Sequence, residues 1–274
     1  MYNSDQHDPY GQPYTPYLTT RTSFGWNLMR YRGFIGILFF VVLGILGRSG
    51  LFSPTVRCSK EISVVQGKYD EIISACTDVI NNDPGSGFAY NNRALGYSGK
   101  EQYDLAIADF NKAIELDPSD PISRANLAQL YADRSDDAKA IEIYTKIIED
   151  QPTYEDAYIG RAWVYYDESK YDLAMDDVKA ALVKSPFSAD AYHIRALINM
   201  EQEDYAEAVT NIERAKVYSP TNIYILVDSA YAHSLADDTE VAIADLKKAL
   251  TLADDPDIKS IAQNLLDKLQ ADYR

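Results

Sequence analysis

The sequence predicts an all-α chain of repeated helix–turn–helix units, preceded by a single hydrophobic helix. Small residues recur with a fixed period along most of the chain, and an uncharged apolar run at residues 33–47 comes before them. A third observation sets the period, because proline returns every 34 residues, at Pro84, Pro118, Pro152, Pro186 and Pro220. A strict period of this length is the signature of stacked helical repeats.

Three columns of small or apolar residues explain the period. The first column precedes the second by twelve residues, and the second precedes the third by seven. Seven residues make two helical turns, so the last two columns share one face of a helix, and turn residues separate the first two. Proline ends the second helix because it cannot continue the hydrogen-bond ladder. The columns are Ala94, Ala128, Ala162, Ala196 and Ala230; Ala106, Ala140, Ala174, Ala208 and Ala242; and Val79, Ala113, Ile147, Ala181, Ala215 and Ala249.

Residues 89–118 (AYNNRALGYSGKEQYDLAIADFNKAIELDP) resemble a tetratricopeptide repeat, and residues 161–186 are nearly as similar. The resemblance implies a right-handed α-solenoid with a concave groove that binds protein segments. We predict five repeats over 87–256 and a capping helix over 257–274. Residues 53–86 form a degenerate first repeat or a linker, because Lys60 and Ser63 stand where a small and an aromatic residue are expected.

Residues 1–30 form a Tyr/Pro-rich tail, and we expect it to be disordered because it has few aliphatic side chains to bury. Residues 31–52 contain the apolar run and are predicted to be a transmembrane anchor. Its fifteen residues span only about 22 Å as a helix, but flanking Arg30, Arg32 and Arg48 can snorkel to the interface. The alternatives are a buried core helix, a cleaved signal peptide that would make the protein secreted, or a lipoprotein; Arg57 before Cys58 disfavours the last.

Charge is distributed unevenly along the chain. Only six of the 26 basic and two of the 42 acidic residues lie in the first sixty, so residues 61–274 carry a formal charge of −20. Such a body repels phosphate backbones, which disfavours nucleic acid as a partner. The positive charges flanking the apolar run are balanced, so orientation is weakly specified, and we expect the repeats to be extracytoplasmic rather than cytoplasmic.

The resemblance places the groove at positions 2, 5, 9, 12 and 13 of each unit. These positions contain no lysine or arginine, which disfavours the carboxylate-clamp activity known in the family and favours a neutral-to-basic protein or peptide with apolar anchors. Trp163 and Tyr166 are the strongest ligand candidates, although such side chains can equally pack between repeats. The predicted partner-binding residues are Phe88, Asn91, Leu95, Ile122, Gln129, Ile159, Trp163, Tyr166, His193, Leu197, Met200, Tyr224 and Tyr231.

Arginines at position 7 are interpreted as structural. Arg93 and Asp109 are sixteen residues apart, as are Arg161 and Asp177, and the same two positions turn apolar together as Leu127 and Ile143. We therefore predict an intra-repeat ion pair that one unit replaces by a hydrophobic pair. Arg195 and Asn211 would be a looser version of it.

The sequence predicts no catalytic residues, no metal site and no cofactor, because it has no glycine-rich phosphate loop, metal cluster or nucleophile–base arrangement. Cys58 and Cys76 would form a disulfide only if the repeats face an oxidising compartment. The leading hypothesis is a membrane-anchored scaffold that binds protein segments, with the lipid bilayer contacted through 33–52. A protein-targeting receptor with cytosolic repeats is the alternative.

Overall fold

The computed structural model describes Cys58 and residues 68–272. The predicted tail 1–30, the predicted anchor 31–52 and all but Cys58 of residues 53–67 lie outside the described residues. Where the chain is described, none of its helices combines the length and the apolar character that a membrane crossing requires.

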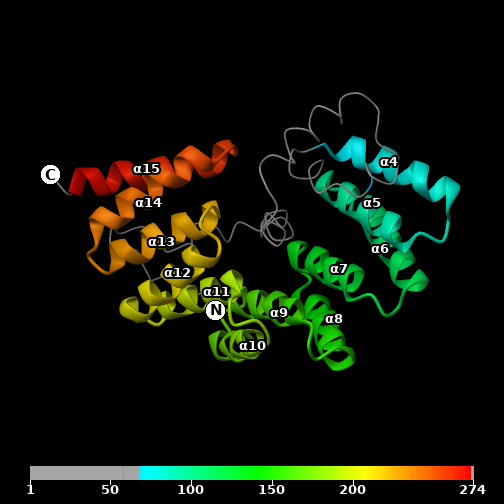
Figure 1. Ribbon diagram of the computed structural model, residues 1–274, viewed down its shortest axis with the longest axis horizontal. Coiled ribbons are helices and arrows are strands. Elements are labelled where there is room, and N and C mark those ends of the chain that lie inside the picture. The colour runs from blue at the N-terminus through cyan, green and yellow to red at the C-terminus, as the bar shows by residue number, and fades with distance from the viewer. Residues whose placement is uncertain (1–57, 59–67, 273–274) are drawn as a thin grey trace. The chain divides into compact units, whose positions relative to one another are not determined.

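The described part consists of helices joined by short turns (Figure 1) and contains no strand. We call α5, α7, α9, α11 and α13 the A helices and α4, α6, α8, α10, α12 and α14 the B helices. The bounds are α4 Tyr69–Asn82, α5 Gly87–Gly99, α6 Tyr103–Leu116, α7 Pro121–Asp133, α8 Asp137–Asp150, α9 Glu155–Asp167, α10 Tyr171–Lys184, α11 Ala189–Glu201, α12 Tyr205–Tyr218, α13 Ile223–Leu235, α14 Thr239–Leu252 and α15 Pro256–Asp272.

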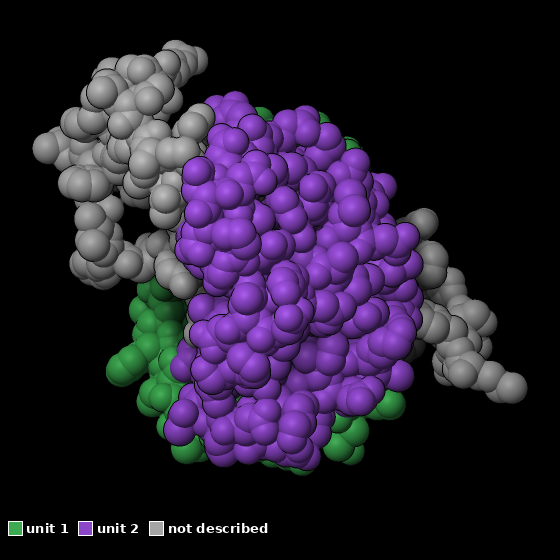
Figure 2. Space-filling model, turned by 90° about the vertical axis from the view of Figure 1, so that its right-hand side faces the viewer, with its two compact units in different colours: residues 1–21, 158–274 green, residues 22–157 purple. Residues whose placement is uncertain are grey.

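The described residues divide into two compact parts, coloured separately in Figure 2. The N-terminal part ends at Ala157 and the C-terminal part begins at Tyr158, within the first turn of α9. In the N-terminal part, consecutive helices from α4 to α8 pack against one another. The same sequential packing runs from α10 to α15 in the C-terminal part.

The two alanine columns are the places where helices approach closely. All ten of their alanines are fully buried. A methyl group leaves room for a large neighbour, and Ala94 and Ala106 accordingly pack in one cluster with Phe110. In the C-terminal part, Ala230 and Ala242 pack in the same way with Leu246. The periodic small residues therefore set the distance between the A and B helices.

The turn between an A helix and its B helix is closed by the same device in five repeats. One residue of each turn adopts the left-handed region, with φ between 58° and 63°, and the next N–H reaches back five residues. Gln102 N, for example, donates to Tyr97 O at 2.9 Å. This is the Schellman arrangement, which satisfies carbonyls at the end of the helix. The left-handed residues are Glu101, Ser135, Ser169, Glu203 and Asp237.

Helix α15 covers the last repeat. Its apolar stripe buries Ile258, Leu265, Leu266 and Leu269. The three leucines join the cluster around Leu246 of α14. The opposite face is exposed, as a terminal helix of a repeat array requires for solubility.

Cys58 and Cys76 are joined by a disulfide, with their Cα atoms 4.6 Å apart. Both cysteines are fully buried, and they pack with Ile72 and Ala75. Asn92 of α5 donates from Nδ2 to the carbonyl of Cys58 at 3.0 Å. The bridge therefore ties the chain before α4 to the first helix pair.

Candidate functional site

The predicted groove residues of the N-terminal part differ in their exposure. Phe88 and Ile122 occupy the second position of α5 and α7, and each side chain is about half exposed. Leu95 is partly buried against the cluster of Ala94 and Phe110. Gln129 is partly buried too, and it accepts a hydrogen bond from Tyr144 Oη at 3.3 Å. Among the predicted groove residues of this part, Phe88 and Ile122 are therefore the exposed apolar side chains.

In two repeats, the residue at position 5 of an A helix forms a buried hydrogen bond with the next A helix. Asn126 Nδ2 of α7 donates to Asn91 Oδ1 of α5 at 2.9 Å. In the C-terminal part, His193 Nε2 of α11 lies 2.7 Å from Asp228 Oδ2 of α13. Both pairs are 35 residues apart, which is one repeat plus one residue. Asn91 and His193 therefore join one repeat to the next.

Most of the predicted groove residues of the C-terminal part are buried. Their ring or aliphatic atoms are withdrawn from solvent because the A helices pack against one another and against their B helices. Tyr224 is partly buried, and burial raises the pKa of its hydroxyl. The buried residues are Ile159, Tyr166, His193, Leu197, Met200 and Tyr231.

Like Tyr224, Trp163 remains partly exposed at this face. Its ring meets Tyr166 edge-on, with centroids 5.9 Å apart, and His193 edge-on at 5.6 Å. Tyr166 and Tyr171 both donate to the carboxylate of Glu201, at 3.3 and 3.2 Å. Aromatic contacts and hydrogen bonds thus hold the surroundings of Trp163 in one geometry.

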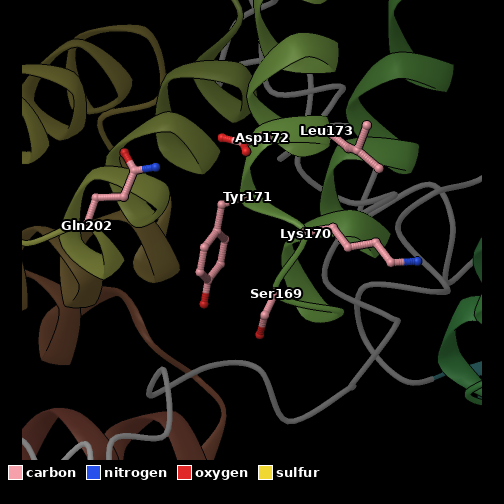
Figure 3. A pocket seen from close by; sticks show the side chains of 6 residues that line it. All are labelled: Ser169, Lys170, Tyr171, Asp172, Leu173 and Gln202. Atoms are coloured by element: carbon pink, nitrogen blue, oxygen red, sulfur yellow. The ribbon is translucent and has the colours of Figure 1, made fainter. Parts of the chain in front are cut away.

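An open depression of about 460 Å³ lies beside this aromatic group, at the turn between α9 and α10. Figure 3 shows the Tyr171 ring at its centre, whereas Lys170 and Leu173 point away from it. Lys170 is paired with Glu168 at 3.0 Å. The side chains that line the depression therefore do not converge on a common point, as a catalytic centre would require.

The predicted structural pairs lie together. Arg93 donates to both oxygens of Asp109, from Nε at 2.7 Å and Nη2 at 2.9 Å. Arg161 binds Asp177 in the same bidentate way, with both distances 2.8 Å. Leu127 is buried at the equivalent position with Ile143 packed against its cluster. Arg195 keeps one contact of this kind, from Nε to Asn211 Oδ1 at 2.8 Å.

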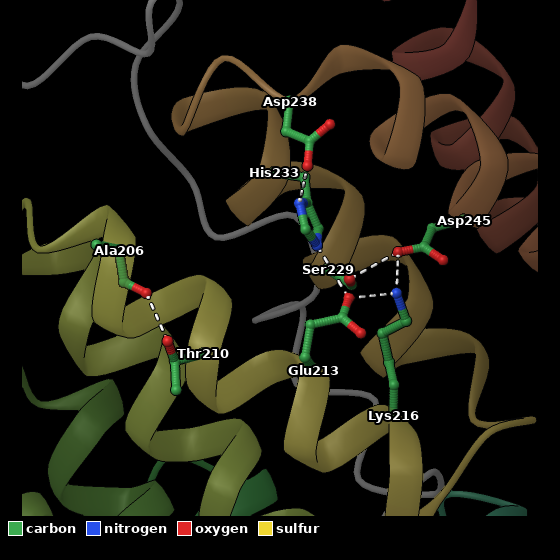
Figure 4. Close-up of polar contacts among 8 residues, drawn as sticks. All are labelled: Ala206, Thr210, Glu213, Lys216, Ser229, His233, Asp238 and Asp245. Atoms are coloured by element: carbon green, nitrogen blue, oxygen red, sulfur yellow. Dashed lines mark hydrogen bonds and ion pairs between the residues drawn. The ribbon is translucent and has the colours of Figure 1, made fainter.

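The last repeat keeps the aspartate of the pair and lacks the arginine, whereas the repeat of Arg195 keeps the arginine and lacks the aspartate. Asp245 is retained, but Ser229 replaces the arginine and donates to Asp245 Oδ2 at 2.7 Å. The positive charge comes instead from Lys216 of the preceding repeat, whose Nζ lies 2.6 Å from Asp245 and 2.7 Å from Glu213 (Figure 4). Burial lowers the pKa of Lys216, but its hydrogen bonds to the two carboxylates outweigh burial and raise it. The sequence pattern did not reveal this cluster, because its members come from different positions of two repeats.

His233 extends the cluster. Its Nε2 lies 2.9 Å from Glu213 and its Nδ1 lies 3.2 Å from Asp238 (Figure 4). Glu213, His233 and Asp245 have ligand atoms close enough to surround one cation. The ammonium of Lys216 already lies between the two carboxylates, so a metal ion would have to displace it. The arrangement is that of a partly buried ion-pair network that joins α12 to α13 and α14.

Comparison with known proteins agrees with these features. The tetratricopeptide repeat family matches residues 88–120, 110–142 and 159–222. These residues form tetratricopeptide repeats. No curated protein has a significantly similar sequence.

Solved structures share the tetratricopeptide fold. TTC0263, a thermophilic TPR protein of Thermus thermophilus, has a TM-score of 0.59 at 19% identity over 66% of this chain and 99% of its own. Yeast Tom70 has a TM-score of 0.66 at 19% identity over 74% of this chain and 44% of its own. The APC/C hetero-tetramer Cut9–Hcn1 has a TM-score of 0.63 at 13% identity over 74% of this chain and 46% of its own. At these identities the likeness establishes the fold alone.

Proposed function

We propose that this protein is a membrane-anchored scaffold that binds a segment of another protein on the A-helix face around Trp163. The tetratricopeptide fold suggests a protein–protein interaction scaffold. The observation that carries the assignment of the site is the partly exposed indole of Trp163, held between Tyr166 and His193. Fixed aromatic side chains that retain some exposure are the usual anchors of protein interfaces.

The charges near this face support a choice of partner. Asp167 is exposed at the end of α9, and Asp190 is partly exposed in the first turn of α11. Glu201 accepts hydrogen bonds from two tyrosines beside Trp163. An apolar side chain on the indole with a basic residue next to it would therefore find both packing and charge complementarity. We propose a neutral-to-basic segment with an apolar anchor.

The proposal of a membrane anchor rests on the sequence, because residues 31–52 contain a long uncharged apolar run. The proposed location of the repeats is extracytoplasmic, and the Cys58–Cys76 disulfide supports it, because disulfides persist in oxidising compartments. A targeting receptor with cytosolic repeats would expose the same bridge to a reducing environment.

Site-specific photo-crosslinking tests the binding site. A photoreactive phenylalanine analogue replaces Trp163 in the full-length chain, and the matched control carries it at Lys179 on the exposed face of α10. We expect one dominant cross-linked partner from position 163 that is absent from position 179. The same set of products from both positions would contradict a binding site at Trp163.

Fractionation of cells tests the anchor separately. The full-length chain should remain with membranes after an alkaline carbonate wash, and deletion of 31–52 should release it. Recovery of a shortened chain in the medium would instead indicate a cleaved signal and a secreted protein. Protease added to intact cells should cut the repeats if they are extracytoplasmic, whereas full protection would favour the targeting receptor.

A further inference from the structure

Arg195 is an arginine whose repeat has lost the matching carboxylate. In two sister repeats the equivalent arginine binds both oxygens of an aspartate. Here the partner is Asn211, which accepts from Arg195 Nε at 2.8 Å and brings no charge. The amide nitrogen of Asn211 is occupied elsewhere, with Asn199 Oδ1 at 3.1 Å and Glu207 O at 2.8 Å. In the last repeat, Lys216 supplies the positive charge that the missing arginine would have brought to Asp245. Beside Arg195, no carboxylate of the described residues forms an ion pair in place of the missing aspartate.

A second guanidinium adds to this positive charge. Arg214 of α12 lies three residues after Asn211, and its Cζ is 5.5 Å from the centroid of the Tyr192 ring. Arg195 Cζ is 4.9 Å from the same ring. Burial lowers the pKa of Arg195, and the charge of Arg214 acts in the same direction; Tyr192 and exposed Glu207 raise it, but burial outweighs them. Two cations thus face one ring, and within the described residues neither forms an ion pair with a carboxylate.

Exposed aromatic side chains continue from this pair of cations. The Tyr218 ring lies 5.7 Å from Tyr192, and Phe187 lies 5.5 Å from Tyr218. Phe187 is 70% exposed and Tyr218 is 39% exposed. These residues belong to the turn before α11 and to the end of α12, so they form a row beside the arginines. The surface combines two guanidinium groups with a row of aromatic rings, in contrast to the acidic surroundings of Trp163.

We propose that Arg195, Arg214 and the row Tyr192–Tyr218–Phe187 form a second docking surface, for a partner segment that carries a carboxylate next to an aromatic side chain. The carboxylate supplies the charge that the sister repeats obtain from Asp109 and Asp177, and guanidinium groups bind carboxylates through paired hydrogen bonds. The adjacent aromatic side chain packs on Tyr218 and Phe187. An extended nucleic acid is disfavoured, because the rest of the repeat region is strongly acidic.

Fluorescence anisotropy with the full-length chain in mild detergent tests the proposal. The probes are labelled short synthetic peptides that place an aspartate beside a tryptophan, the same peptide with asparagine, and the same peptide with phosphoserine. We expect the aspartate peptide to bind at least about tenfold more tightly than the asparagine peptide. Equal binding of these two would overturn the proposal, and binding of the phosphoserine peptide alone would overturn the choice of a carboxylate.

Asn211→Asp is the decisive variant, because it rebuilds the internal ion pair of the sister repeats, although it gives up the two hydrogen bonds that Asn211 Nδ2 donates. Circular dichroism checks that the variant is folded. We expect Asn211→Asp and Arg214→Gln each to lower the affinity for the aspartate peptide by about tenfold or more. Arg134→Gln is the matched control, since Arg134 lies over one tyrosine ring, that of Tyr103, at 5.4 Å. Unchanged binding in Asn211→Asp would refute the site. Trp163→Ala should leave this binding intact, so failure of the two proposals is distinguishable.

Discussion

Arg161 and Asp177 form a two-bond ion pair between α9 and α10, with both distances 2.8 Å and less than a fifth of either side chain exposed. The two charges stabilise each other in a setting where neither is well hydrated. Such a pair differs from the exposed lysine–glutamate contacts on the B helices, which contribute little because water screens them.

Replacement of one partner of this pair should therefore be more harmful than replacement of both. We expect Arg161→Leu to lower the free energy of unfolding by about 3 kcal/mol, since it leaves Asp177 buried and unpaired. The double variant Arg161→Leu/Asp177→Ile reproduces the Leu127 and Ile143 combination of another repeat and should regain most of the loss. Urea denaturation followed by circular dichroism measures both. Equal losses in the two variants would argue against the pairing.

The disulfide predicts a redox-dependent stability. Cys58 and Cys76 are eighteen residues apart, and closing a loop of that size stabilises a domain by about 3 kcal/mol. Thiol titration of the denatured, unreduced protein should find no free thiol, and Cys58→Ser should unfold at lower denaturant concentration. Under reducing conditions the parent protein and Cys58→Ser should unfold alike. Two titratable thiols in freshly purified protein would contradict the bridge.

The left-handed turn residues predict a stabilising substitution. Glu203 has φ of 60°, which costs a residue with a Cβ more than it costs glycine. We expect Glu203→Gly to raise the free energy of unfolding by about 0.5–1 kcal/mol, after allowing for the extra freedom of the unfolded chain. Gln202→Gly is the control, because Gln202 has φ of −90° and gains nothing from glycine. Destabilisation by Glu203→Gly would mean that the side chain contributes more than the backbone strain costs.

The cluster around Lys216 predicts a loss of stability in acid. Burial raises the pKa of Glu213, but the hydrogen bonds from Lys216 and His233 outweigh it and hold this pKa below its usual 4.5. A carboxylate with a depressed pKa stabilises the fold above 4.5 and loses that contribution as the pH falls through the folded value. The melting temperature of Glu213→Gln should therefore fall less steeply below pH 4.5 than that of the parent. Glu142→Gln on the exposed face of α8 is the control. Parallel curves for the parent and Glu213→Gln would contradict the role of this carboxylate.

The fold followed from the sequence because the repeat imposes one geometry many times over. Pro118, Ala94 and Ala106 recur at equal spacing, and close helix packing tolerates only small side chains at the alanine positions. The Arg–Asp pairs could be predicted for the same reason, because both positions become apolar together in one repeat, as Leu127 and Ile143. Periodicity turns a single sequence into several independent observations of one unit.

The candidate binding face was harder to predict, because position in a repeat does not determine burial. Tyr166 and His193 stand at groove positions, yet Glu201 and Asp228 of the following helices engage them. The 35-residue spacing of Asn91 and Asn126 was the available signal for such links. The left-handed turns left no signal at all, because Glu101 and its equivalents are not glycines.

The hydrogen bond between His193 and Asp228 constrains how this surface can diversify. His193 touches the Trp163 ring on one side and holds the next repeat on the other. A lineage that acquires a new ligand by replacing His193 must at the same time compensate Asp228, so such changes should arrive in pairs. The partly exposed Trp163 ring lies outside that hydrogen bond, and natural variation in specificity can accumulate there one substitution at a time.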